Sequence, residues 1–351
     1  MGDSTAKNRI LILGAAGFIG TNLTLRLLKE DAPLILFDRP GTVWAAPVQE
    51  ALDAGTKVQE AHGAAAQSQT QEGAADVPGV QAVLGSFSDP GEGGWQALLP
   101  RLKEVDTVYH LISTTCPTNS NRDVAAEMED NLIATIRFLD ACVQAGVKKV
   151  VFLSSGGTVY GREHAGICRE EEEAFPISSY GVQKLAIEKM LYLYHEMYGL
   201  DYRIVRLSNP YGPYQRPNGV QGVVTTFTWK ALQGEPIEIY GDGSVVRDYI
   251  YIEDAVEGIL RIAKGQTKHR LYNLGRGQGS SVADVVEAIT KVLGKRPEVL
   301  YRPGRPVDVP VNVLDISRFC EDFGPFEPVS LQTGIRRLVE FYEAQGGAAA
   351  R

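Results

Sequence analysis

Cysteine is scarce in this sequence of 351 residues, which contains four in all. They lie far apart and form no CxxC pair, which excludes a disulfide framework and a zinc-binding cluster; they are Cys116, Cys142, Cys168 and Cys320. The five histidines are scattered too, so we expect no metal site. Lysine and arginine, 35 together, are outnumbered by 43 aspartates and glutamates, giving a formal net charge of −8. An acidic chain without a long basic run argues against a nucleic-acid partner and an anionic membrane surface.

Long hydrophobic runs are missing as well. The apolar run from Ile10 to Leu13 passes straight into glycines, which is too short for a signal-peptide core or a membrane span. Together with the few, unpaired cysteines, this predicts a soluble cytoplasmic protein. Hydrophobic residues at 44% and charged residues at 22% lie near the globular averages of roughly 45–50% and about 25%, which excludes bulk disorder. The length suits one large domain or two smaller ones with a hydrophobic core.

Glycine is the residue in excess, with 37 in the chain, above the usual share of roughly 7%. Glycine is needed where the backbone turns tightly or approaches another group closely. The excess therefore directs attention to turns that contact a ligand.

Short β-branched or aromatic runs alternate with longer amphipathic runs through the first half of the chain. The predicted strands are Ile10–Leu13, Leu34–Phe37, Val80–Leu84, Thr107–Leu111, Val150–Ser154 and Tyr202–Leu207. The predicted helices include Phe18–Lys29, Val124–Ala145 and Ser179–Tyr198. This alternation predicts an α/β fold with a doubly wound parallel sheet. After Pro210, clusters of Pro and Gly predict the loops of a smaller domain that closes over a ligand.

Residues 41–79 interrupt this alternation. The segment is rich in Ala, Gln, Gly and Glu, and the tetrapeptide VQEA occurs at both 48–51 and 58–61. It predicts a surface excursion of loop and short helix without chemistry of its own. A flap near a bound cofactor is the alternative, because the segment directly follows the second predicted strand.

A glycine-rich turn joins the first predicted strand to the first predicted helix, in the order Gly14-Ala-Ala-Gly17-Phe18-Ile19-Gly20. Small side chains let the backbone approach a pyrophosphate, and the helix N-terminus supplies free N–H groups and a positive dipole end. Asp38 ends the second strand, eighteen residues past Gly20. A carboxylate there accepts hydrogen bonds from a ribose 2′-hydroxyl and repels a 2′-phosphate, so we predict NAD rather than NADP. Arg39, beside it, can accommodate that phosphate and keeps NADP open.

Tyr180 and Lys184 lie four residues apart, on one face of a predicted helix. A tyrosine is a poor base near neutral pH, but a nearby ammonium and the positive charge of a bound nicotinamide lower its pKa. No other of the fifteen tyrosines has a lysine at this spacing. A surface pair without function is the alternative. The preceding strand ends in hydroxyl residues, among them Ser155 and Thr158, that could share a proton with a substrate alcohol.

The chain resembles the extended short-chain dehydrogenase/reductase superfamily, and within it the nucleotide-sugar epimerases related to UDP-galactose 4-epimerase. The resemblance covers about residues 8–340, except 41–79, and rests on an ordered set of motifs. These are LGAAGFIG, DTVYHL, SSGGTVYG, YGVQK, RLSNPYGP, VVRDYIYIEDAV and RPGRPVDVP.

The resemblance implies the following site. The turn residues Gly14, Gly17, Phe18, Ile19 and Gly20, with Asp38, Arg39, Ser86, Phe87, Leu111, Tyr180 and Lys184, bind NAD. The catalytic group comprises Tyr180 as base, Lys184 as its partner, and Thr158 or Ser155 as the hydroxyl. The nucleotide-sugar ligands are Asn209, Arg247, Arg305, Asp308 and Asn312. Arginine suits the diphosphate because its planar fork bonds two oxygens at once. An ion pair between Arg247 and Asp248 is the alternative for that residue.

The resemblance also implies a domain organisation. Residues 1–206 form an NAD-binding Rossmann domain, with 41–79 as the surface excursion, and about 246–274 rejoin it. Residues 207–245 and 275–345 form a smaller α/β substrate domain. Relatives commonly dimerise through the helix that bears the catalytic tyrosine, so we expect a homodimer. Polysaccharide biosynthesis is the expected process.

Two departures from the family pattern bear on activity. Gly156 occupies the usual place of the catalytic Ser or Thr, so Thr158, or else Ser155, takes over that role. The third predicted strand leads into Gly85-Ser86-Phe87, without the acid that usually lies near the adenine.

The expected function is NAD-dependent C4 epimerisation of a UDP-hexose or UDP-N-acetylhexosamine through a 4-keto intermediate. A nucleotide-sugar 4,6-dehydratase is the main alternative, but Gly157 and Thr158 replace its Asp-Glu pair. A fucose-synthase-type enzyme would carry a cysteine in place of Gly156. A non-catalytic NAD-binding protein is a further alternative.

Overall fold

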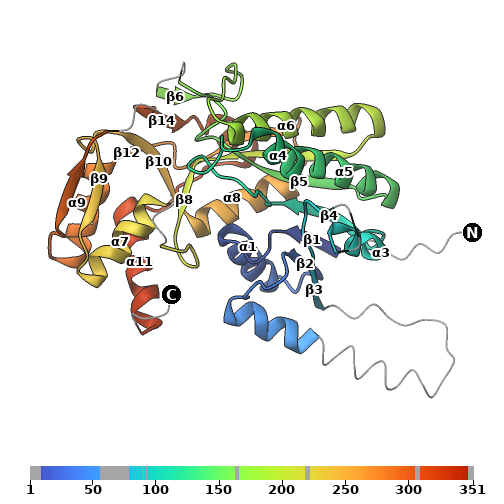
Figure 1. Cartoon of the computed structure of the whole chain (residues 1–351), viewed down its shortest axis with the longest axis horizontal. Helices are drawn as coiled ribbons and strands as arrows, with labels where there is room; N and C mark the ends of the chain where they lie inside the picture. The colour runs from blue at the N-terminus through green and yellow to red at the C-terminus, as the bar shows by residue number, and fades with distance from the viewer. Residues whose placement is uncertain are drawn as a thin grey trace, which may run out of the picture. The chain divides into compact units, whose positions relative to one another are not determined.

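The computed structural model describes residues 9–55, 79–89, 91, 93–162, 166–217, 222–304 and 309–346 (Figure 1). Two predicted substrate ligands, Arg305 and Asp308, lie outside the described residues, as does the part of the 41–79 excursion from 56 to 78. The described part of that excursion includes a helix over 46–55.

Seven parallel strands form the main sheet, in the order β11-β7-β5-β4-β1-β2-β3. They are β1 (Arg9–Leu13), β2 (Leu34–Asp38), β3 (Val80–Leu84), β4 (Val105–His110), β5 (Lys149–Ser155), β7 (Asp201–Leu207) and β11 (Leu271–Leu274). The chain runs outward from β1 to β3 and then returns to place β4 on the other side of β1. This reversal makes the sheet doubly wound and places its topological switch point at the carboxyl ends of β1 and β4, where ligands bind in such sheets. The predicted fold class is confirmed, and each of the six predicted strands is present.

Helices connect these strands. They are α1 (Phe18–Leu28), η1 (Trp95–Leu98), α3 (Leu99–Leu102), α4 (Val124–Met128), η2 (Glu129–Ile133), α5 (Ala134–Ala145), α6 (Ser179–Tyr198) and α8 (Ile252–Lys264). The predicted helix over 124–145 is not regular throughout, because η2 is a turn of π-helix between α4 and α5. Such turns insert an extra residue and often mark functional sites.

The chain divides into two compact units. The first comprises Met1–Thr114, Ala125–Phe152 and Lys189–Tyr202, and the second comprises Thr115–Val124, Leu153–Glu188 and Arg203–Arg351. In the first unit, β1, β2 and β4 are fully buried along most of their length, as parallel strands covered on both faces are.

The second unit contains a further α/β assembly. Its strands are β6 (Gly166–Cys168), β8 (Asn209–Tyr211), β9 (Ile237–Tyr240), β10 (Val246–Tyr251), β12 (Gly279–Ser281), β13 (Val299–Arg302) and β14 (Val311–Leu314). One sheet has the order β12-β10-β14-β6 with β8 paired to β10, and β13 pairs with β9. Its helices are α7 (Val223–Gln233), α9 (Val282–Leu293), α10 (Ser317–Phe323) and α11 (Leu331–Ala344). The predicted C-terminal α/β assembly is thus present, while the domain limits stay a prediction.

Within the described residues, no helix is both long enough and apolar enough to cross a membrane.

The N-terminus of α9 is held by a reciprocal capping box. The Ser281 hydroxyl accepts a hydrogen bond from the Asp284 backbone N–H at 3.0 Å, and the Asp284 carboxylate accepts one from the Ser281 backbone N–H at 2.8 Å. These bonds satisfy two backbone donors that the helix itself leaves unpaired. They fix the start of a helix whose Val285 and Ile289 lie in the core of the second unit.

Replacement of this cap gives a first prediction. Ser281→Ala should lower the free energy of unfolding by about 1 kcal/mol, because a backbone N–H loses its acceptor. Thermal unfolding should show a midpoint lower by roughly 2–4 °C. The neighbouring variant Ser280→Ala, outside the capping box, is the control. Equal losses in both variants would contradict the assignment.

Candidate functional site

The glycine turn after β1 needs glycine for two separate reasons. Gly14 has a φ of +82°, a left-handed conformation that residues with a side chain rarely adopt. A Cβ on Gly20 would lie 2.1 Å from the Gly14 carbonyl oxygen and 2.8 Å from the Ala15 Cα. Position 20 therefore permits the close packing of α1 on the turn. The turn packs closely against the segment after β4, since a Cβ on Gly14 would lie 3.2 Å from Ile112 Cγ1 and 3.3 Å from its backbone nitrogen.

The N-terminus of α1 opens from this turn without a side-chain cap. Gly17 is the N-cap residue and makes no capping hydrogen bond through a side chain, and the first turn carries no acidic residue. Backbone N–H groups at such a terminus, with the positive end of the helix dipole, form a site for an anion. This helix terminus, with Phe18 and Ile19 in its first turn, offers backbone N–H groups alone and therefore fits the pyrophosphate of a dinucleotide.

Asp38 links the end of β2 to the glycine turn. Its Oδ2 accepts a hydrogen bond from the Ala16 N–H at 2.8 Å, and its Oδ1 accepts from the Arg39 N–H at 2.8 Å and from the Thr42 hydroxyl at 3.2 Å. The carboxylate thus has a set orientation beside the turn, and the residue is only half-buried. The Arg39 side chain is exposed.

The other predicted cofactor residues occupy the ends of β3 and β4. The Phe87 ring is buried and packs edge-on to His110 at 5.1 Å and against Phe138 at 5.7 Å between centroids. A cofactor contact from Phe87 would therefore come from its backbone. The Ser86 hydroxyl lies 3.3 Å from that of Ser88, and the Leu111 N–H donates to the Leu13 carbonyl at 3.1 Å.

Asn131, in the π-helical turn, was not predicted as a functional residue. Its Oδ1 accepts a hydrogen bond from the Thr114 N–H at 2.8 Å, and its Nδ2 donates to the Thr114 hydroxyl at 2.7 Å and to the Glu127 carbonyl at 2.9 Å. The buried amide therefore holds the segment that follows β4. A polar residue within a helical pattern is the only signal of this role in the sequence.

Tyr180 and Lys184 lie in the first turns of α6, opposite the end of β5. A hydrogen bond joins the Tyr180 hydroxyl to the Ser155 side chain. The Lys184 Nζ is buried, donates to the Leu153 carbonyl at 2.8 Å and lies 5.6 Å from the centre of the Tyr180 ring. The structure thus brings Tyr180, Lys184 and Ser155 together.

Burial dominates the pKa values in this cluster. Burial raises the pKa of Tyr180 to about 12, and the hydrogen bond from Ser155 opposes that rise. The expected lowering by Lys184 together with a bound nicotinamide stays a prediction. Burial lowers the pKa of Lys184 to about 8, against the opposing charge of Glu188. Lys184 is thus still mostly an ammonium at neutral pH.

The two hydroxyl candidates are placed differently. Ser155 bonds Tyr180, whereas the Thr158 Oγ1 is buried and has no hydrogen-bond partner among the described residues. Gly156, between them, has no room for a side chain. A Cβ there would lie 2.5 and 2.8 Å from the two methyl carbons of Leu314 and 3.1 Å from the Arg206 carbonyl oxygen. This crowding explains why glycine replaces the usual hydroxyl residue at 156.

Three of the predicted substrate ligands lie on neighbouring strands. Asn209 of β8 pairs with Tyr249 of β10, and Arg247 of β10 pairs with Asn312 of β14. Asn312 is buried, and its Nδ2 donates to the Gly156 carbonyl at 3.2 Å, while its Oδ1 has no hydrogen-bond partner among the described residues.

Asp248 fixes this group of strands from the opposite face of β10. Its fully buried carboxylate accepts hydrogen bonds from the backbone N–H groups of Arg276, Gly277 and Leu314, at 2.8, 3.1 and 3.4 Å. Burial raises the pKa of Asp248 to about 6. Because alternate residues of a strand face opposite ways, the Arg247 side chain leaves β10 on the other face. Its Nη1 donates to the Val309 carbonyl at 2.6 Å.

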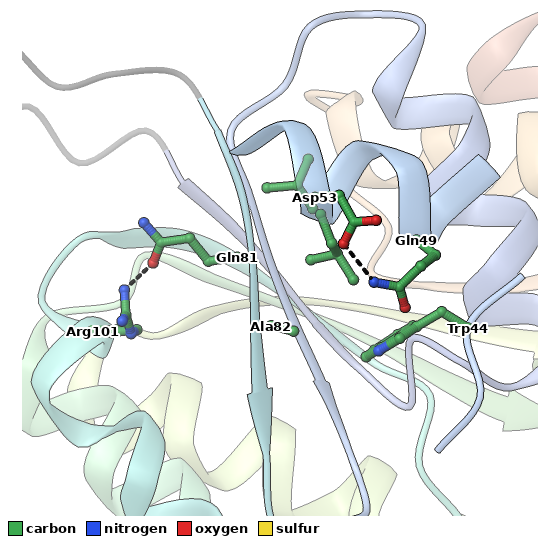
Figure 2. A pocket seen from close by; sticks show the side chains of 8 residues that line it. Trp44, Gln49, Asp53, Gln81, Ala82 and Arg101 are labelled. Atoms are coloured by element: carbon green, nitrogen blue, oxygen red, sulfur yellow. Dashed lines mark hydrogen bonds between the residues drawn. The ribbon is translucent and has the colours of Figure 1, made fainter. Parts of the chain in front are cut away.

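A separate cavity lies in the first unit, beside the edge strand β3 (Figure 2). It is lined by Trp44, Gln49, Leu52, Asp53, Val80, Gln81, Ala82 and Arg101. Its polar side chains already pair with one another, Gln49 with Asp53 at 2.9 Å and Arg101 with Gln81. None of the predicted site residues lines it.

The crowding at position 156 gives a second prediction. Gly156→Ser should destabilise the protein by about 1–3 kcal/mol, because the new side chain overlaps Leu314 within a packed core. Gly157→Ala is the matched control, since a Cβ there would make only ordinary contacts of 3.9 and 4.0 Å. Urea unfolding of both variants measures the difference. A Gly156→Ser protein as stable as the control would show that Leu314 moves aside.

Comparisons with known proteins show the family of this chain. The model of the NAD dependent epimerase/dehydratase family matches residues 10–275. The UDP-glucose 4-epimerase of Mycolicibacterium smegmatis is 32% identical over 334 residues, which cover 95% of this chain and 98% of that protein. The dTDP-4-dehydro-6-deoxyglucose reductase of Escherichia coli is 28% identical over 346 residues, with 95% and 97% covered.

A solved structure shares the whole fold. The UDP-glucose 4-epimerase of Thermus thermophilus, in complex with NAD, superposes with a TM-score of 0.77 at 28% identity, over 95% of this chain and 99% of that one. The predicted superfamily and its NAD dependence are thereby confirmed. The chain belongs to the NAD dependent epimerase/dehydratase family.

Proposed function

We propose that this protein is an NAD-dependent epimerase that inverts C4 of a UDP-hexose or UDP-N-acetylhexosamine through a 4-keto intermediate. The observation that carries the proposal is the cluster of Tyr180, Ser155 and Lys184 at the end of β5. A hydroxyl, a phenol and a buried ammonium in this arrangement suit the reversible oxidation of an alcohol.

The glycine turn and Asp38 are the proposed NAD site. Gly14, Gly17 and Gly20 let the backbone approach the pyrophosphate, and the carboxylate of Asp38 accepts from the adenosine ribose. When bound, NAD supplies the acceptor for the hydride that leaves C4 and the donor that returns it to the opposite face of the ring.

Tyr180 is the proposed base. It takes the proton of the sugar 4-hydroxyl as the C4–H bond breaks, and gives it back when the ketone is reduced. Its own pKa of about 12 means that the phenolate needs added stabilisation, which the Lys184 ammonium supplies while it stays protonated. Ser155 bonds the phenol oxygen and is the proposed hydroxyl of the site, with Thr158 as the second candidate.

The substrate diphosphate is proposed to bind at Asn209, Arg247 and Arg305, and the uridine ribose at Asp308. Asn312 lies at the position that governs room beside the sugar in related epimerases. A side chain smaller than tyrosine there suits an N-acetyl group as well as a hydroxyl.

A homodimer through α6 is the proposed assembly. The helix buries Leu191 and Tyr194, yet Tyr192, Leu193 and Met197 are exposed at 55%, 42% and 57%. Large apolar side chains exposed together on one helix indicate a surface that a second copy could cover.

Product analysis tests the proposed reaction. Incubation with UDP-glucose or with UDP-N-acetylglucosamine should yield the C4 epimer, detected by NMR, without added cofactor being consumed. Tyr180→Phe should reduce the rate by about 10²–10⁴-fold, since the proton acceptor is lost. Tyr301→Phe, an exposed tyrosine of β13, is the control. A 4-keto-6-deoxy product would identify a dehydratase instead, and full activity of Tyr180→Phe would remove the proposed base.

Cofactor selectivity gives a separate prediction. The wild type should bind NADH more tightly than NADPH, because the Asp38 carboxylate repels a 2′-phosphate. Asp38→Asn should reduce that preference by about tenfold or more, and fluorescence titration with both nucleotides measures it. Asp53→Asn, an exposed aspartate of the 46–55 helix, is the control. Equal affinities in the wild type would mean that Arg39 accommodates the phosphate.

A further inference from the structure

A buried ion pair lies beside the proposed catalytic cluster. Arg206 of β7 donates from Nε to the Glu188 Oε1 at 3.1 Å and from Nη2 to Oε2 at 2.8 Å. Both side chains are only 4% exposed. The Ser154 hydroxyl donates to the Glu188 Oε1 at 2.5 Å. A buried carboxylate is costly unless it is paired and hydrogen-bonded, and this one is both.

The pair continues a series of bonds between α6 and β5. Tyr180, Lys184 and Glu188 follow one another at intervals of four residues, and therefore share one face of the helix. Tyr180 bonds the Ser155 side chain, Lys184 bonds the Leu153 carbonyl, and Glu188 bonds the Ser154 hydroxyl. Three consecutive residues of the strand end are thus each tied to this face. Arg206, on β7, binds the Glu188 carboxylate and so orients it toward the Ser154 hydroxyl.

The charge of Glu188 also acts on Lys184. Burial favours the neutral amine, and Glu188 opposes it, leaving Lys184 with a pKa of about 8. The other ionisable groups here are Tyr180 on α6, Arg206 on β7 and Tyr160 after β5. The guanidinium of Arg206 binds Glu188 and stacks on the Tyr160 ring, 4.9 Å from its centre. Cys116 acts on Tyr180 rather than on Lys184.

We propose that Glu188, held by Arg206, is a positioning residue that keeps the Lys184 ammonium charged and seated against the end of β5. Glu188 contacts no reacting atom in this scheme and acts through Lys184. The inference deepens the proposed function, since it rests on the role given there to Lys184.

The charge of Lys184 can be measured without turnover. In protein labelled with ¹⁵N-lysine, NMR follows the Nζ signal of Lys184, which is assigned by its absence from Lys184→Arg. Its midpoint should lie near pH 8 in the wild type. Glu188→Gln should lower it by about one pH unit or more. Glu196→Gln, an exposed glutamate of the same helix, should leave it unchanged.

Kinetics then separates positioning from general stability. At a fixed pH of about 8, kcat of Glu188→Gln should fall by about fivefold or more, with KM within about twofold, because the ammonium fraction falls. Glu188→Asp keeps the charge but withdraws it by one methylene. Its loss of kcat and its lowering of the Lys184 midpoint should therefore both be smaller than those of Glu188→Gln. If Glu188→Gln does not fold, this smaller downward shift in Glu188→Asp decides alone.

Two results separate this inference from the proposed function. An unchanged Lys184 midpoint in the folded Glu188 variants would overturn the role of Glu188. A shifted midpoint in a protein that epimerises no UDP-sugar would leave the charge coupling standing and refute the epimerase proposal alone.

Discussion

The seating of α6 against the end of β5 is the constraint on which the proposed chemistry depends. Tyrosine, lysine and glutamate at four-residue intervals each bond one of three consecutive strand residues. Such a series sets both the rotation of the helix and its position along its axis. A shift of one residue would place a different side chain opposite Ser155. The series also includes the buried ammonium of Lys184. The same contacts therefore set both the position of Lys184 and its charge.

Much of the fold followed from the sequence because its signals are local. Period-two and period-3.6 patterns revealed the strands and helices, and the glycine spacing located the turn after β1. The Tyr180–Lys184 pair was visible for the same reason, since one helix carries both residues. The π-helical turn at Asn131 was not visible, because one inserted residue hardly changes a helical pattern.

Contacts between distant residues could not be read in this way. Glu188 and Arg206 meet across two elements, and the side chain that crowds Gly156 belongs to Leu314. The burial that raises the pKa of Tyr180 could not be predicted either, because the sequence shows a neighbouring charge but not the depth of burial. The sequence offered Asp248 as a partner for Arg247, yet Asp248 accepts hydrogen bonds from three backbone N–H groups in two other segments.

The contact between Gly156 and Leu314 links two segments that are 158 positions apart in the chain. Gly156 directly follows β5, which ends at Ser155, and Leu314 lies two positions beyond Asn312 on β14. A relative with a serine or threonine in place of Gly156 should therefore carry a smaller or differently directed side chain in place of Leu314. The two positions are expected to change together during divergence, and with them the spacing between the end of β5 and β14.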